Sequence, residues 1–210
     1  MNRICLITLA TTLLFANPAW SRTINLMSLI DPKRDAVKGE WRFQDRGLVS
    51  DNTTTARLQI PFQPPEEYDF RIEFVCLQRT QMVCQIFSQT GRAAMFVMGG
   101  GSGNLFGFSL VDAKRSDNNR TTAGVDSGLG IKRSHTSLLQ VRRGGVRAFF
   151  NGKLTSEWKT NYKDANLSKF WEMPSHQLLG IGSRSRTTFH VIELLEIAGK
   201  GKPVTPPSTR

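Results

Sequence analysis

Residues 137–158, SLLQVRRGGVRAFFNGKLTSEW, constrain the fold of this chain more than any other segment. They predict three consecutive antiparallel strands joined by two glycine turns, the first a two-residue turn at Gly144-Gly145. A two-residue Asn151-Gly152 loop would pair even-numbered residues of the first strand with odd-numbered residues of the second. Apolar residues such as Val146 and Ala148 would then lie opposite polar residues such as Lys153 and Thr155. Burial therefore favours a three-residue loop that ends at Gly152 with a bulge there. This register places the following residues on one face: Val146, Ala148, Leu154, Ser156 and Trp158.

The rest of the chain also reads as short strands. Residues 68–76 alternate strictly between apolar and charged side chains, which is typical of a half-buried antiparallel strand. A polar loop at 111–132 and an irregular excursion at 159–176 interrupt the pattern, and no long helical stripe occurs. We therefore predict an all-β fold, a two-sheet antiparallel β-sandwich of jelly-roll type with few short helices. The other expected strands cover residues 40–44, 47–50, 56–60, 82–88, 93–98, 105–110, 178–183 and 187–197.

The first 21 residues have the features of a signal peptide. Arg3 precedes an apolar run at residues 4–16, which is too short to span a bilayer, and Ala19 and Ser21 suit a cleavage site before Arg22. The expected organisation is a signal peptide at 1–21, one domain at 22–199 and a disordered tail at 200–210. We therefore expect an exported protein, either periplasmic, secreted or at the cell surface, with no transmembrane segment once the signal is removed.

Two cysteines remain after residue 21. Cys76 and Cys84 flank LQRTQMV, and a hairpin centred on Thr80 would place them opposite each other. In an oxidising compartment this pair could form a disulfide, and the alternative is two small buried apolar residues.

The chain is basic, with a formal net charge of +11, and the excess lies in its second part. Residues 74–210 hold 19 of the 28 Lys and Arg but only 8 of the 17 Asp and Glu. Such a field favours anionic partners such as acidic glycans, although a solvated basic surface is also consistent with it. Export and the lack of interleaved aromatics argue against nucleic acid. A possible polyanion-binding ladder comprises Lys132, Arg133, Arg142, Arg143 and Arg147.

Several segments resemble known families. The meander with its FFNGKL turn is similar to the core of laminin-G-like and concanavalin A-like jelly-roll domains. The segments GEWRFQDRGLVSD, RLQIPFQPPEEYDFRIEF, NGKLTSEW and FHVIELLEI resemble secreted bacterial sandwich proteins related to the 3-keto-disaccharide hydrolase domain. The resemblance implies a concanavalin A-like sandwich over most of residues 22–199. It transfers no catalytic residue, because the matching positions are strand edges and turns.

Signatures of common enzyme chemistry are missing from the sequence. No G-x-S-x-G elbow or P-loop is present, and the histidines lack metal-ligand spacing, so we expect no metal and no cofactor. Glycoside hydrolysis needs two carboxyl groups about 5–10 Å apart, and Glu67, Asp69 and Glu73 share one strand face. Arg71 lies among them and would pair with its neighbours, so a charge-paired outer face is the favoured interpretation.

The loop at 112–120 is the strongest binding candidate. It follows the glycine-rich GGGSGN segment and concentrates groups that can bind sugar hydroxyls. Trp171 or Phe149 could supply the aromatic platform for a sugar ring, although turn chemistry alone would also explain the Asn and Asp residues. The predicted ligand-binding residues are Asp112, Lys114, Arg115, Asp117, Asn118, Asn119 and Trp171.

Taken together, these patterns favour an exported carbohydrate-binding module over an enzyme. The expected partner is a polysaccharide or cell-envelope glycan, neutral or acidic. Two alternatives remain open, namely a glycoside-processing hydrolase and a structural or adhesive domain that binds another protein through a sheet face.

Overall fold

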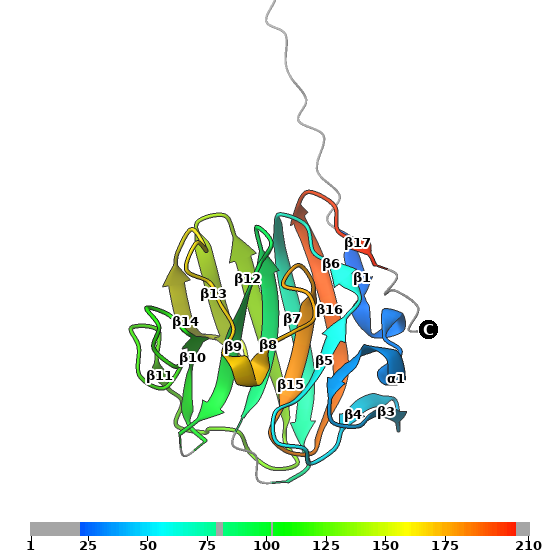
Figure 1. Cartoon of the computed structure of the whole chain (residues 1–210). Helices are drawn as coiled ribbons and strands as arrows, with labels where there is room; N and C mark the ends of the chain where they lie inside the picture. The colour runs from blue at the N-terminus through cyan, green and yellow to red at the C-terminus, as the bar shows by residue number, and fades with distance from the viewer. Residues whose placement is uncertain (1–21, 79–81, 102, 205–210) are drawn as a thin grey trace, which may run out of the picture.

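The computed structural model describes residues 22–78, 82–101 and 103–204, and the predicted signal peptide lies outside these ranges. Two large antiparallel sheets face each other (Figure 1). The only helical segments in the described residues are η1 (Leu26–Leu29), α1 (Pro32–Asp35) and η2 (Lys169–Trp171). The predicted all-β sandwich with few short helices is therefore confirmed.

Sheet A has eight strands and contains the predicted meander. Strand β1 (Thr23–Asn25) pairs with β16 outside the main order. The main order is β14 (Lys153–Lys159), β13 (Gly145–Phe150), β12 (Ser134–Arg142), β7 (Glu67–Cys76), β16 (Thr187–Ala198), β4 (Gly47–Ser50) and β3 (Trp41–Gln44).

Sheet B has seven strands, and a separate two-stranded ribbon joins β6 (Phe62–Gln63) to β17 (Lys202–Pro203). The ribbon shows that the first described residues of the predicted tail belong to the fold. Sheet B has the order β11 (Ala123–Gly124), β10 (Leu105–Ser109), β9 (Arg92–Gly100), β8 (Val83–Gln89), β15 (Leu179–Ser183), β5 (Ala56–Ile60) and β2 (Ala36–Lys38).

The main core fills the space between the sheets and is rich in aromatic rings. On β7 every second residue from Tyr68 to Cys76 is buried and the intervening residues are half-buried, as the alternation predicts. Across the sheets, Phe106 of β10 packs against Phe150 of β13, and Phe108 of β10 packs against Trp158 of β14. Aromatic contacts of this kind account for much of the packing that holds the two sheets together.

The second turn of the meander differs from the prediction. Phe150 pairs with Lys153, so the loop has two residues, and both Asn151 (φ 49°) and Gly152 (φ 80°) have positive φ. The register then shifts further along, because Ala148 pairs with Ser156 and Phe149 with Leu154. The irregularity near residue 155 restores the expected burial beyond it but leaves Leu154 47% exposed. The predicted bulge was real, but its position at Gly152 was wrong.

The first turn is displaced by one residue. Arg142 pairs with Gly145, so the two-residue loop is Arg143-Gly144 and not Gly144-Gly145. Gly145 has a φ of 148°, and a Cβ there would lie 2.5 Å from the carbonyl oxygen of Trp158. Glycine is needed at this position because the neighbouring strand approaches so closely.

The two cysteines do not face each other across a hairpin. Cys76 lies on β7 in sheet A and Cys84 lies on β8 in sheet B, and both are free and buried. The predicted hairpin was wrong, because β7 pairs with β12 and β16 whereas β8 pairs with β9 and β15. The alternative of two small buried apolar residues describes them, and no disulfide joins them.

Candidate functional site

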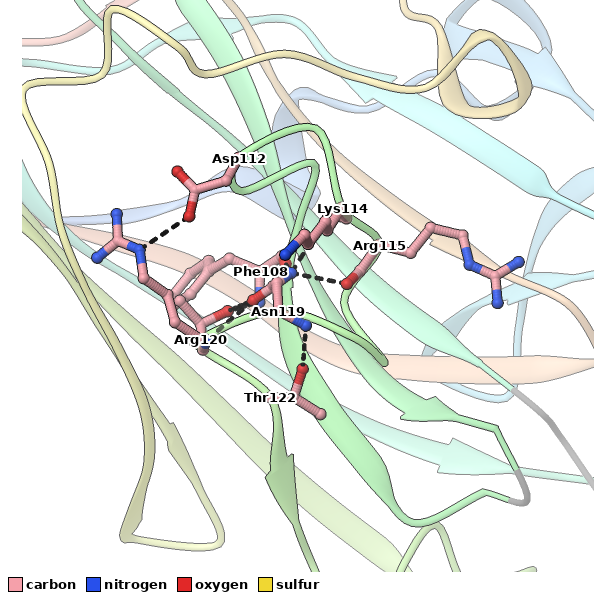
Figure 2. A network of polar contacts seen from close by, with 8 residues as sticks. Phe108, Asp112, Lys114, Arg115, Asn119, Arg120 and Thr122 are labelled. Atoms are coloured by element: carbon pink, nitrogen blue, oxygen red, sulfur yellow. Dashed lines mark hydrogen bonds and ion pairs between the residues drawn. The ribbon is translucent and has the colours of Figure 1, made fainter.

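The predicted binding loop is folded around the side chain of Asn119 (Figure 2). Its amide nitrogen donates to the carbonyl oxygens of Phe108 (2.8 Å) and Arg115 (2.7 Å). Its amide oxygen accepts from the backbone N–H (2.8 Å) and hydroxyl (2.6 Å) of Thr121. Asn119 therefore shapes the loop, and both ends of its amide are engaged within the protein.

The structure separates the other predicted loop residues into two groups. Arg115 and Asp117 line a pocket of about 500 Å³, whereas Asp112, Lys114 and Asn118 are exposed outside its lining. Asp112 accepts from the guanidinium of Arg120 at 3.2 Å, as Figure 2 shows. The predicted loop therefore borders a pocket, but the sequence did not distinguish the residues that face it.

The pocket lies on the outer face of sheet B, the face turned away from the main core. A second apolar cluster covers this face, formed by residues of β8 and β9 with Leu167, Trp171 and Met173. The segment at 167–178, called the strap below, lies across the outer face, in front of β8 and β9 in Figure 1. The pocket occupies the space between the strap and the loop at 112–120.

The strap is held to the sheet by side chains that donate to its backbone carbonyls. Arg57 donates to Glu172 (2.8 Å), Gln59 donates to Ser175 (2.7 Å) and Ser88 donates to His176 (2.7 Å). These bonds satisfy backbone groups of a segment that forms only one short helix, η2, and they fix its position on the sheet.

The aromatic side chain at the pocket rim is one that sequence reasoning missed. Trp171, the predicted platform, is only 3% exposed, and a Cβ on Gly182 would lie 2.5 Å from its ring. Its neighbour Phe170 is 75% exposed and lines the pocket. Phe149, the other predicted platform, lies on β13 in sheet A beneath the guanidinium of Arg147.

The polar groups of the pocket carry more positive than negative charge. Arg115 binds Asp117 through two hydrogen bonds, of 3.2 Å from Nε and 2.7 Å from Nη2. Arg184 also lines the pocket, is exposed and forms no ion pair with another described residue. Backbone of Gly100 and Gly101 completes part of the wall. Two guanidinium groups and one carboxylate therefore surround the space beside Phe170.

The three candidate catalytic carboxylates lie elsewhere, on the outer face of sheet A. Asp69 accepts from Arg142 at 2.7 Å, and Glu67 accepts from the backbone N–H of Arg143 at 3.0 Å. Glu73 is paired with Arg71, which also binds Glu193 of β16 at 2.6 Å. The charge-paired face expected from the sequence is therefore present.

The predicted basic ladder is neutralised in part by its neighbours. Arg142 is paired with Asp69, and Arg143 is paired with Glu66. Arg147 donates to the side chain of Gln140 at 2.7 Å. Lys132, Arg133 and Arg147 form no ion pair with any described residue, so three of the five ladder residues keep an uncompensated charge.

Neither a metal cluster nor a membrane-spanning helix is found in the described part of the chain. No three His, Cys, Asp or Glu side chains in residues 22–78, 82–101 and 103–204 come together as metal ligands would. Over the same ranges no helix has the length and apolar character needed to cross a membrane.

Comparison with known proteins identifies the fold. No family model matches the sequence, and no curated protein matches it. A Bacillus subtilis protein with a galectin-like fold aligns with a TM-score of 0.57 and 12% identity over 85% of this chain and 96% of its own. Carbohydrate-binding module CBM66 from Bacillus subtilis gives 0.52 and 9% over 75% and 92%. The VIP36 exoplasmic/lumenal domain, bound to Ca²⁺ and Man3GlcNAc, gives 0.51 and 6% over 80% and 84%. At such low identity these similarities establish a galectin-like jelly-roll fold.

Proposed function

We propose that this protein is a carbohydrate-binding module whose site is the pocket beside Phe170. The observation that carries the proposal is the 75% exposed phenyl ring at the rim of a pocket of about 500 Å³ lined by Arg115, Asp117 and Arg184. An aromatic side chain beside a few convergent polar groups in a concave site is the arrangement typical of ligand pockets.

The chemistry of the pocket suits a sugar. The C–H face of a pyranose or furanose ring can stack on Phe170, and guanidinium and carboxylate groups can bind its hydroxyls in pairs. Arg184 has no described ionic partner, so the site favours a glycan that carries carboxylate or sulfate groups over a neutral one.

The N-terminal sequence and the similar folds agree with this proposal. Residues 1–21 have signal-peptide features, so we infer export and a polysaccharide or cell-envelope glycan as the partner. Two proteins of similar fold are described as a carbohydrate-binding module and as a glycan-bound domain.

A binding function agrees with the structure better than either alternative. Catalysis by Glu67, Asp69 and Glu73 would require one of them to be protonated, whereas Asp69 and Glu73 accept from guanidinium groups. An adhesive sheet face would require a broad apolar patch. The exposed large apolar side chains instead lie on separate elements, namely Phe43, Ile131, Leu154, Phe170 and Ile197.

Binding of the purified protein to a glycan array, repeated at raised salt, tests this proposal. Phe170→Ala should weaken binding to the selected glycan about tenfold, since aromatic stacking contributes about 1–1.5 kcal/mol. Phe43→Ala is the matched control, because Phe43 is also exposed (49%) but lies on the edge strand β3 of sheet A. Asp117→Ala should also weaken binding, because it removes a carboxylate of the pocket and the two hydrogen bonds that orient Arg115.

The outcomes separate a specific site from the general charge of the protein. Selective binding that depends on Phe170 and is weakened but not abolished at raised salt supports the proposal. Binding that disappears at raised salt and is unchanged in Phe170→Ala would mean that the protein binds glycans only through its general positive charge, and would contradict the proposal. Absence of binding to any glycan on the array would overturn it.

A further inference from the structure

A second cavity, of about 790 Å³, lies on the other side of the strap. Its floor is formed at the edge of sheet B by residues of β2 and β5, and its walls come from α1, from residues 174–178 and from the ribbon of β6 and β17. Four segments that are distant in sequence therefore build it. Its size is typical of a ligand site, and it shares no lining residue with the pocket beside Phe170.

The wall contributed by the C-terminal ribbon is fixed in place. Lys202 and Pro203 pair with Gln63 and Phe62, respectively. The backbone N–H of Gly201 donates to the buried carboxylate of Glu196 at 2.7 Å, and a Cβ at Gly201 would lie 2.5 Å from the ring of Phe62. A wall held by a buried carboxylate and close packing is preorganised, so a ligand need not order it.

The polar groups of the cavity are carboxamides and cations, without an available carboxylate. Asp35 is buried and accepts from Arg34 at 2.7 and 2.8 Å and from the backbone N–H of Asp31 at 2.8 Å. In contrast, the side chains of Gln63, Gln177 and Lys202 form no hydrogen bond or ion pair with other described residues. The cavity therefore presents amide donors and acceptors with an ammonium group.

The apolar lining is aliphatic. Its apolar residues are Ala36, Val37, Leu178, Val204 and three prolines, Pro61, Pro174 and Pro203, and no aromatic side chain is among the described lining residues. A sugar site relies on an aromatic platform, which the pocket beside Phe170 has and this cavity lacks. Aliphatic and proline surfaces instead suit the side chains of an extended peptide, whose backbone amides pair well with carboxamides.

We propose that this cavity binds a short extended peptide segment that carries an acidic side chain. Gln63 and Gln177 bind its peptide groups, Lys202 binds its carboxylate, and Val37, Leu178 and the prolines contact its apolar side chains. Charge complementarity selects the acidic residue, because the only carboxylate in the lining, Asp35, is already neutralised by Arg34. The site is independent of the proposed glycan pocket.

An array of octapeptides with permuted acidic, basic, polar and apolar residues tests the proposal on the purified protein, followed by affinity measurements in solution on the best acidic peptide. Lys202→Glu should weaken that peptide at least tenfold, because it replaces attraction by repulsion at the carboxylate. Lys153→Glu is the matched control, since Lys153 is an exposed lysine on β14 of the other sheet. Phe170→Ala should leave peptide affinity unchanged.

A second variant checks the position of the peptide without altering charge. Leu178→Ala should also weaken binding, by about threefold to tenfold, through loss of apolar contact. Amide NMR shifts on peptide addition should include Val37 and Gln59. The proposal is overturned by selection of basic over acidic peptides, by equal affinity in Lys202→Glu and the parent protein, or by an array on which no acidic peptide binds. Displacement of the peptide by oligosaccharides at this cavity would also overturn it.

Discussion

The outer faces of the two sheets differ in what covers them. On sheet A the outer face of β7 is half-buried and its charges are paired, with Arg71 between Glu73 and Glu193 and with Arg142 bound to Asp69. On sheet B the strap covers the middle of the face with Leu167, Trp171 and Met173, and cavities remain on both sides of it. The two larger cavities of the described structure, of about 790 and 500 Å³, therefore both lie beside the strap.

The burial of individual strands reflects this difference. On β7 buried and half-buried residues alternate, whereas all seven residues of β8 are buried. A strand covered on both faces loses the period of two, since neither face remains in water. The neighbouring β9 is also buried at every residue after Arg92, and its uninterrupted apolar run at 93–98 indicates a covering segment, which here is the strap.

The largest expected effect concerns the strap. Trp171→Ala should reduce the free energy of unfolding by about 3–5 kcal/mol, because it leaves a cavity over sheet B. Urea denaturation measures this loss. Phe170→Ala, one residue away and 75% exposed, should change stability by less than about 0.5 kcal/mol. Equal losses of stability in both variants would contradict the interpretation that Trp171 covers sheet B whereas Phe170 is free to contact a ligand.

A smaller loss is expected where the strap meets the sheet. Gly182→Ala should destabilise the protein by about 1–3 kcal/mol, since the added Cβ would lie 2.5 Å from the Trp171 ring and 2.9 Å from the carbonyl oxygen of Ala56. Gly144→Ala is the matched control, because a Cβ at Gly144 meets nothing within 4 Å. If thermal unfolding shows Gly182→Ala to be as stable as the control, the close approach of the strap does not require glycine at position 182.

Much of the fold could be predicted because strand patterns are local. The alternation at residues 68–76 and the turns near Gly144 and Gly152 predicted β7 and the meander, and the structure confirms them. The position of the bulge could not be predicted. A two-residue and a three-residue loop at Asn151-Gly152 are compatible with the same buried residues once a shift of register is allowed elsewhere in the strand pair. The strand partners of Cys76 and Cys84 depend on which sheet each strand joins, which no local pattern encodes.

The candidate site was predictable only in part. The loop at 112–120 was identified by its composition, but Asn119 is used internally and, of the predicted residues in the loop, Arg115 and Asp117 alone line the pocket. Phe170 was missed because exposure within an irregular segment depends on how that segment packs. Residues that approach from distant parts of the chain, such as Arg184, carry no sequence signal of their own.

The two cysteines report separately on the core and on the covered face. Cys76 lies in the main core and Cys84 lies in the apolar cluster beneath the strap. Neither thiol should react with iodoacetamide in the native protein. Trp171→Ala should open the strap side and allow selective labelling of Cys84, identified by mass spectrometry of peptides. Equal labelling of both thiols would indicate global unfolding and not local exposure.

The same burial makes stability sensitive to alkaline pH. Burial raises the pKa of the Cys76 thiol from 9.0 to about 12 and also raises the pKa of Cys84. The folded state keeps the thiol protonated, so this contribution is complete below pH 9 and is lost as the pH rises toward 12. From Cys76 alone the free energy of unfolding should fall by about 1.4 kcal/mol between pH 7 and pH 10. Cys76→Ala, compared by urea denaturation at both pH values, should lose less stability over this range than the parent protein.

The smallest expected effect lies on the paired face of sheet A. In a double-mutant cycle of Arg71→Met and Glu193→Gln, we expect a coupling energy of about 0.2–1 kcal/mol, because both side chains are about one-third exposed and water screens the pair. Added salt should reduce it. Arg120 and Asp112, which are more exposed and 3.2 Å apart, form the control pair and should show weaker coupling. A coupling energy above about 2 kcal/mol would mean that the outer face of sheet A is shielded from water by a partner or an ordered layer, although no strap covers it.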